Sequence, residues 1–298
     1  MNFIKKLKYS PINVQLIITR RCNLACGYCN EYDHQSLPVP KEKLIRYFSK
    51  LAELGTLSIT FSGGEPLLHP DIVDLVIEAK KKIPFVAFIT NAYLLTEELV
   101  KKLNEAKLSG VQISVDGVSP DKVTVKVLKF IKPKLDILAK SAKFSVNINS
   151  VIGSQKPEEA IEVIKYAKKC GFSTTIGLLH DSTGKLCLNE KQLKVYRELE
   201  NERKVPFWDF GNFEKEFIKN GSSPFKCRSG SRYLYVDEFG KVRYCSQTFK
   251  MYEKDLLSLT ESDLEDNFYR YKPCCEKCTI GCVRRASWID QWRFQNKR

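Results

Sequence analysis

Six short runs of apolar and β-branched residues predict the strands of a buried sheet. Each run is bounded by polar or turn-forming residues, and its near-continuous apolar character is typical of strands that are covered on both faces. The expected strands are residues 13–19, 57–61, 84–90, 111–116, 144–150 and 172–178.

The segments between these runs show the 3.6-residue periodicity of amphipathic helices. In the first of them, Leu44, Phe48 and Leu51 fall on one face. Thr96 is expected to cap the third helix, and Pro133 to break the fourth. The predicted helices cover residues 41–54, 71–82, 97–106, about 120–141, 157–169 and about 190–204.

Strand and helix alternate six times between residue 13 and about residue 178, as in consecutive βα units. Strands connected in this way pair in parallel through right-handed crossovers, so the pattern predicts an α/β fold with a barrel-like sheet. Six units are fewer than the eight that close a TIM barrel. In barrels of this type the chemistry lies at the carboxyl ends of the strands.

Composition places the chain among ordinary globular proteins, with 298 residues, of which 43% are hydrophobic and 28% charged. No stretch approaches the roughly 18 apolar residues that span a bilayer, and the basic start has no apolar region of a signal peptide behind it. We therefore expect no membrane association and a cytoplasmic location.

The net charge of +14 has two interpretations. Lysines solvated on helix faces account for it without any function. Alternatively, it favours an acidic partner such as a phosphorylated small molecule, a nucleotide or an acidic peptide. Nucleic acid is an unlikely partner, because no compact platform of basic and aromatic residues is visible.

Three thiols lie on the loop that follows the first predicted strand, at Cys22, Cys26 and Cys29. A structural zinc site takes four ligands, commonly with a C-x2-C pair, so three thiols at C-x3-C-x2-C are the wrong number. Three suits a [4Fe–4S] cluster that keeps one iron open for a small molecule. Eleven cysteines in a cytosolic chain indicate metal rather than disulfides.

A second motif, Ser62-Gly63-Gly64-Glu65-Pro66, follows the second predicted strand. Two glycines permit close approach of backbone to a ligand, and the turn carbonyls with Glu65 can accept hydrogen bonds from an ammonium group. With Tyr28 before the third cysteine, the two motifs resemble the signature of the radical S-adenosylmethionine (SAM) superfamily. The resemblance implies an open, partial TIM-type (β/α)6 barrel, with SAM bound to the cluster beside Gly63, Gly64 and Glu65.

Polar side chains at other strand ends are further candidates for contacts with SAM or substrate. Turn chemistry at the end of a strand is the alternative explanation for several of them. Asp116, His180 and Asp181 are weak candidates for catalysis. The candidate cofactor-binding residues, besides Tyr28 and the glycine turn, are Asn91, Ser114, Asn147 and Asn149.

A second group of cysteines follows residue 226, around a predicted hairpin with its turn at Gly240. Its spacing resembles the SPASM/twitch extension of radical SAM enzymes, which binds auxiliary [4Fe–4S] clusters. Six thiols are too few for two fully ligated clusters, so one auxiliary cluster is expected. A structural zinc site is the alternative. The expected ligands are Cys227, Cys245, Cys275 and Cys278, with Cys274 and Cys282 as alternates.

The expected domains are the radical SAM core at 1–180, a bridging segment at 181–226 and an auxiliary cluster domain at 227–298. Residues 288–298 are expected to form an amphipathic helix that packs back on the core.

The resemblance implies reductive cleavage of SAM to a 5′-deoxyadenosyl radical, which abstracts hydrogen from an unactivated C–H bond of the substrate. The auxiliary cluster would assist a net oxidation or a rearrangement, which makes the chain an oxidoreductase-type enzyme. A low-potential donor such as flavodoxin or ferredoxin would supply the electron.

Three substrate classes are open: a sugar-like alcohol, a nucleotide, or a peptide or protein side chain as in SPASM-type maturases. About twelve residues precede the first strand, which weakens the peptide option unless a separate protein supplies a leader-binding domain. A hypothesis from another class is a non-catalytic iron–sulfur electron carrier or metal-binding scaffold. It needs no Gly-Gly-Glu turn, which counts against it.

Overall fold

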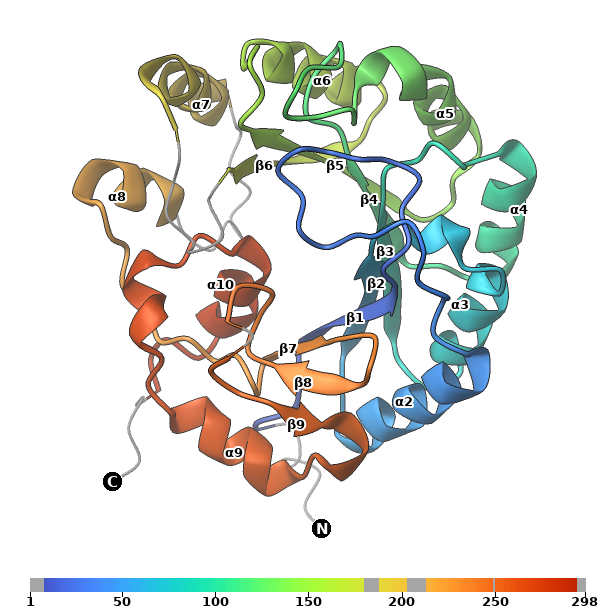
Figure 1. Cartoon of the computed structure of the whole chain (residues 1–298), viewed down its shortest axis with the longest axis vertical. Coiled ribbons are helices and arrows are strands. Elements are labelled where there is room, and N and C mark those ends of the chain that lie inside the picture. The colour runs from blue at the N-terminus through green and yellow to red at the C-terminus, as the bar shows by residue number, and fades with distance from the viewer. Residues whose placement is uncertain (1–7, 180–187, 203–212, 249, 294–298) are drawn as a thin grey trace.

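The computed structural model describes residues 8–179, 188–202, 213–248 and 250–293. Its centre is one curved sheet, in which the strand order is β6-β5-β4-β3-β2-β1-β7-β8-β9 (Figure 1). The strands are β1 Asn13–Thr19, β2 Ser58–Gly63, β3 Phe85–Thr90, β4 Gly110–Ser114, β5 Ser145–Ile152, β6 Ser173–Leu178, β7 Tyr233–Val236, β8 Lys241–Arg243 and β9 Lys254–Asp255.

The six strands expected from the sequence are confirmed, each with a boundary shift of at most two or three residues. Each of β1 to β5 pairs in parallel with the strand that follows it in the sequence. The α/β partial-barrel fold class is therefore confirmed. Because parallel strands share one carboxyl edge, the loops after β1 and β2 emerge side by side.

The helices that follow β1 to β5 cover the outer face of the sheet, whereas α10 lies on its inner side (Figure 1). Leu44, Phe48 and Leu51 are buried in the core as expected, and the Phe48 ring stacks on Phe61 of β2 with centroids 5.6 Å apart. The helices are α2 Lys41–Glu53, α3 Ile72–Lys80, α4 Glu97–Glu105, α5 Leu128–Ser141, α6 Glu159–Lys169, α7 Glu190–Glu202, α8 Phe213–Asn220, α9 Glu261–Tyr269 and α10 Gly281–Trp288.

Two helix predictions were wrong. The helix expected from about residue 120 begins at Leu128, and it continues through Pro133 instead of breaking there. Residues 118–127 form a loop instead, in which the Glu159 carboxylate accepts hydrogen bonds from the Val118 and Ser119 amides. At the carboxyl end, the helix expected at 288–298 lies earlier, as α10, and its part up to residue 293 forms turns.

The predicted hairpin is confirmed as β7 and β8, with Gly240 in the left-handed region at φ +86°. The sequence did not indicate that β7 would pair in parallel with β1. As a result, one sheet extends across the predicted domain boundary at residue 226. Leu234 and Val236 of β7 share a single hydrophobic core with Leu16 of β1.

Thr96 caps α4 as predicted, because its side-chain oxygen accepts a hydrogen bond from the Leu99 amide at 3.1 Å. Within the described ranges, no helix is both long and apolar enough to cross a bilayer.

Candidate active site and metal centres

The loop after β1 carries three free thiols within eight residues, Cys22, Cys26 and Cys29. The Leu24 amide donates to the Cys22 sulfur at 3.4 Å, and the Asn91 side-chain amide approaches the same sulfur at 3.9 Å. Burial raises the pKa of the Cys22 and Cys29 thiols. Partly desolvated thiols with N–H donors aimed at sulfur are suited to a metal, whose positive charge stabilises the thiolate.

Arg20 fixes the two ends of this loop to each other and to the β7–β8 hairpin. Its guanidinium forms an ion pair with Glu31, donates to Glu238 at 2.9 Å and donates to the Tyr235 hydroxyl at 3.0 Å. The Tyr235 hydroxyl donates in turn to Glu31 at 2.7 Å. Tyr235 and the carboxylates of Glu31 and Glu238 hold the pKa of Arg20 above its usual range against the opposing effect of burial. The cysteine loop therefore depends on residues from the far end of the chain.

The Gly-Gly-Glu turn contacts the cysteine loop directly. The Gly64 amide donates to the Thr19 carbonyl at 2.9 Å, and a Cβ atom on Gly64 would lie 2.3 Å from the carbonyl oxygens of Arg20 and Arg21. Gly63 adopts φ +124°, and a Cβ atom there would lie 2.0 Å from the Thr19 oxygen. The glycines are thus required for contact between the two motifs. The sequence had indicated only that they permit close approach of the backbone to a ligand.

Glu65 is fully buried and its carboxylate is occupied within the fold. It accepts hydrogen bonds from the Leu67 amide at 3.0 Å, the Thr90 hydroxyl at 2.6 Å and the Asn91 amide at 2.8 Å. Burial raises the pKa of Glu65 to about 6, against the opposing effect of these donors. In this structure Glu65 joins the turn after β2 to the end of β3.

Tyr28 of the cysteine loop forms a cluster with the buried Asp116 and the half-buried Lys126. The Tyr28 hydroxyl donates to Asp116 at 2.8 Å, and the Lys126 ammonium lies 3.4 Å from the same carboxylate and 4.7 Å from the Tyr28 ring centre. Lys126 also hydrogen-bonds to the Tyr28 hydroxyl. Asp116 further accepts from the Thr124 hydroxyl and the Val151 amide. Asp116, a weak catalytic candidate, is therefore occupied in holding Tyr28 and the loop.

Asn147 and Asn149 face the same interior cavity, of about 650 Å³, as their spacing on a strand predicts. Thr175 of β6 donates to the side-chain oxygens of both at 2.9 Å. Ser114, the last residue of β4, pairs in register with Asn149. The cavity is also lined by Gln15, Thr60, Gln112, Cys282 and Arg285.

The cysteines after residue 226 gather from four separate segments. Cys245, Cys274 and Cys278 line a single cavity of about 500 Å³. Cys227 is buried, and burial together with this neighbouring thiol raises the pKa of Cys245, Cys274, Cys275 and Cys278. Cys275 belongs with Cys227, Cys245 and Val283 to a small cluster of buried side chains, and it is not among the residues that line this cavity. The structure thus gathers most of the expected thiols, and it places Cys274 rather than Cys275 on the cavity.

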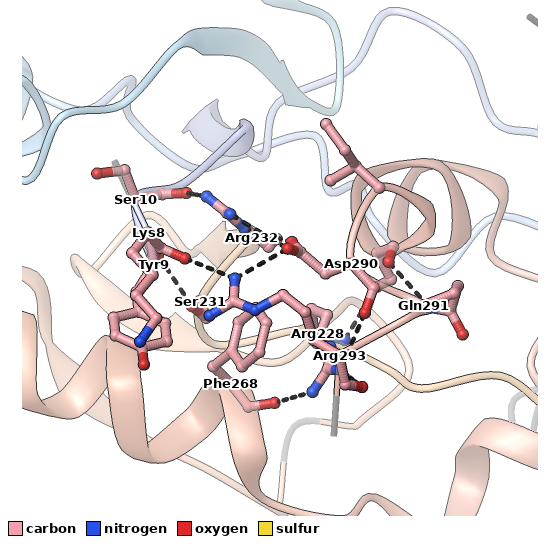
Figure 2. A network of polar contacts seen from close by, with 12 residues as sticks. Lys8, Tyr9, Ser10, Arg228, Ser231, Arg232, Phe268, Asp290, Gln291 and Arg293 are labelled. Carbon is pink, nitrogen blue, oxygen red and sulfur yellow. Dashed lines mark hydrogen bonds and ion pairs between the residues drawn. The ribbon is translucent and has the colours of Figure 1, made fainter. Parts of the chain in front are cut away.

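Two buried cations, Lys272 and Arg228, lie next to the backbone of Cys227. The Lys272 ammonium is 3.3 Å from the Cys227 carbonyl and also donates to the Asn267 carbonyl. Arg228 donates to the carbonyls of Phe268, Asp290 and Arg293 (Figure 2). Burial lowers the pKa of Lys272 to about 8 and that of Arg228 to about 10.

Figure 2 shows how Arg228 belongs to a network that ties the carboxyl end of the chain to its start. Arg232 donates to Asp290 at 2.6 Å and to the Ser10 carbonyl at 3.0 Å. Arg293 donates to Asp290 at 2.9 Å and to the Lys8 carbonyl at 2.9 Å.

Among the described residues, no three His, Cys, Asp or Glu side chains are arranged to hold a single metal ion. The residues present fit iron–sulfur clusters because thiols are the usual ligands of such clusters. Three thiols lie on one loop, and a second set of thiols lies around one cavity. His180 and Asp181 lie outside the described residues. Sequence reasoning missed Arg20, Lys126 and Lys272, because the contacts that distinguish them from other cations join distant segments.

Comparison with known proteins agrees with this geometry. The model of the Radical SAM superfamily matches residues 16–183. A PqqA peptide cyclase of Bradyrhizobium diazoefficiens is 41% identical over 111 residues, which are 36% of this chain and 29% of that protein. A probable GTP 3′,8-cyclase of Sulfolobus acidocaldarius is 27% identical over 258 residues, or 78% of this chain and 80% of that one.

Solved structures share the fold at low identity. SuiB of Streptococcus suis, bound to its precursor peptide SuiA, superimposes with a TM-score of 0.64 at 16% identity, covering 87% of this chain and 65% of that one. The anSMEcpe structure with AdoMet and a peptide has a TM-score of 0.62 at 21% identity, covering 96% and 91% of the two chains.

The chain belongs to the radical SAM superfamily, because the family model matches more than half of it. Membership implies an enzyme that uses a [4Fe–4S] cluster and SAM. The match to the Bradyrhizobium protein spans less than a third of that protein's length, so substrates and partners are matters for proposal.

Proposed function

We propose that this enzyme abstracts a hydrogen atom from a polar substrate held in the interior cavity, between the SAM site and an auxiliary iron–sulfur site. The observation that carries the proposal is the lining of that cavity. Gln15 donates to Ser62, the first residue of the Gly-Gly-Glu motif, on one side of the cavity. Thr279, just before α10, and Cys282, in the first turn of α10, lie on the other side beside the second cysteine set.

Cys22, Cys26 and Cys29 are the proposed ligands of the first cluster, and the turn at Gly63 and Gly64 is the proposed neighbour of the SAM amino group. When bound, the cluster and SAM supply a 5′-deoxyadenosyl radical. The protein's own residues fix the geometry. Arg20 holds the loop ends, and the curved sheet and α10 lie on two sides of the interior (Figure 1).

An auxiliary [4Fe–4S] cluster is proposed at Cys227, Cys245 and Cys278, with either Cys274 or Cys275 as the fourth ligand. The shared cavity favours Cys274, whereas the C-x2-C spacing favours Cys275. Reduced thiols in this number support a cytoplasmic location.

A peptide side chain is the proposed substrate class. Four of the first five relatives are named PqqA peptide cyclases, and the two solved structures described above contain peptides. A nucleotide is the second candidate. Arg285 in the cavity and the net charge of +14 favour an anion, and the Sulfolobus relative named a GTP cyclase matches over most of both chains. Flavodoxin or ferredoxin is the proposed electron donor.

The decisive experiment is anaerobic turnover of the reconstituted protein with SAM and dithionite. Formation of 5′-deoxyadenosine is expected, and its stimulation by a candidate peptide or by GTP would identify the substrate class. A protein that binds iron and sulfide but releases no 5′-deoxyadenosine would support an electron carrier and overturn the proposal. Zinc in the second site would overturn the auxiliary cluster alone.

A further inference from the structure

Two positively charged side chains next to the second cysteine set, Lys272 and Arg228, are buried from solvent. Lys272 is 1% exposed and Arg228 is fully buried, and they lie next to the backbone of Cys227. Buried cations are costly unless they are solvated by protein groups, and here backbone carbonyls surround them. Carbonyl dipoles lower that cost but leave the full positive charge in place.

The position of Lys272 indicates which group its charge would act on. Its ammonium lies 3.3 Å from the Cys227 carbonyl, and burial lowers its pKa, whereas the neighbouring Cys227 and Cys274 raise it. Beside the first cysteine loop the arrangement is different, because Lys126 lies 3.4 Å from the buried carboxylate of Asp116. Beside the first loop the half-buried cation is thus paired with a carboxylate, whereas beside the second cysteine set the Lys272 ammonium contacts the backbone of a proposed cluster ligand, Cys227.

An iron–sulfur cluster ligated by thiolates is an anion, and its charge becomes more negative when it is reduced. A buried cation stabilises the reduced form more than the oxidised form, and the effect is strong because the interior screens charges weakly. We propose that Lys272, assisted by Arg228, raises the reduction potential of the auxiliary cluster and so favours its reduced state. A cluster that is easier to reduce is better suited to receive an electron than to deliver one.

This inference rests on the proposed auxiliary cluster, so the test separates the two. The full-length Cys22→Ala/Cys26→Ala/Cys29→Ala protein is reconstituted anaerobically, which leaves the second site alone. About four irons per chain are expected. A protein that retains no iron overturns the auxiliary cluster and this inference together. A protein that retains it allows the reduction potential to be measured by an EPR-monitored redox titration.

Lys272→Gln in that background keeps a hydrogen-bond donor but removes the charge, and Lys272→Arg is the control that keeps the charge. The Gln variant is expected to need a potential lower by about 59 mV or more, which is a tenfold change in the ratio of reduced to oxidised cluster. The Arg variant is expected to titrate close to the parent. Equal potentials for the parent and the Gln variant, at equal iron content, would overturn the inference.

Arg270→Gln provides a second measurement in case Lys272→Gln fails to bind iron. Arg270 is exposed, so its replacement leaves the buried carbonyl contacts intact. Its removal is expected to lower the potential in the same direction by a smaller amount, because solvent screens it more. An unchanged or higher potential in this variant counts against the proposal.

Discussion

The two cysteine sites are built in different ways. At the first, three thiols lie within eight residues of a single loop, and the surrounding charges are paired, as in Lys126 with Asp116. At the second, the thiols come from segments that only folding brings together, and the neighbouring cations are held by backbone carbonyls. The first site is thus a local motif that the fold supports, whereas the second exists only as a product of the fold.

The largest effect is expected from removing the first site. Cys22→Ala/Cys26→Ala/Cys29→Ala should lose about four of eight irons and all cleavage of SAM, because no ligands for the open cluster remain. Iron and sulfide analysis with an assay for 5′-deoxyadenosine measures both. Cys170→Ala is the matched control, since Cys170 ends α6 away from both sets and should change neither. Full iron and activity in the triple variant would refute the assignment.

At the second site, Cys274→Ala and Cys275→Ala form a matched pair. Cys274 lines the cavity, whereas Cys275 does not line it and belongs to the buried cluster with Cys227 and Cys245. We expect Cys274→Ala to lose up to about four irons and Cys275→Ala to retain them. The opposite result would restore the C-x2-C pair as the ligand set.

Removing Lys126 from its ion pair with Asp116 should destabilise the fold. Lys126→Met is expected to cost about 4 kcal/mol, because it leaves the Asp116 carboxylate buried without its cation. Lys126→Met/Asp116→Asn should recover part of that loss. Urea unfolding of the single and double variants measures the coupling, and strictly additive effects would contradict it.

Gly64→Ala tests the contact between the two motifs. The new Cβ atom would meet two backbone oxygens at 2.3 Å, so a loss of about 3 kcal/mol is expected, with weaker SAM binding. Gly171→Ala is the control, since Gly171 has φ +79° and open space around it and should cost only about 1 kcal/mol. Thermal unfolding and SAM titration compare the two, and equal losses would argue against a specific contact.

The smallest effect is a dependence of stability on pH. The pKa of Glu65 is raised to about 6 from 4.5, so the folded protein binds this proton more tightly than the unfolded chain does. The contribution of the Glu65 proton to the free energy of unfolding is fully present below pH 4.5. It is lost as the pH rises through 6, and it amounts to about 2 kcal/mol. Glu65→Gln should flatten the stability profile between these pH values, and an unaltered slope would contradict the assignment.

Local patterns were enough to predict the parallel sheet and the first site. Apolar runs marked the strands, and the loop thiols and the Gly-Gly-Glu turn stood directly after two of them. The same patterns failed where structure depends on distant contacts. β9 is only two residues long, α10 begins at a glycine, and Pro133 is accommodated inside α5. Nothing in the sequence separates Lys126 and Lys272 from other lysines, because burial and partners define them.

The choice between Cys274 and Cys275 shows the same limit. The two cysteines are adjacent, so their spacing to the other thiols is nearly the same, and only the fold places Cys274 on the cavity and Cys275 in the buried cluster. Glu65 shows a related limit. The motif predicted that its carboxylate could accept from a ligand, whereas in the fold that carboxylate accepts hydrogen bonds from Thr90 and Asn91.

The pairing of β7 with β1 has a consequence for how the molecule can be divided. Without the segment after residue 226, β1 would present an unpaired backbone edge and the Arg20 network would lose Tyr235 and Glu238. An excised amino-terminal fragment would then offer that bare edge to other chains. The segment after residue 226 is accordingly a structural part of the same sheet as β1, and the amino-terminal part is expected to lose stability when it is removed.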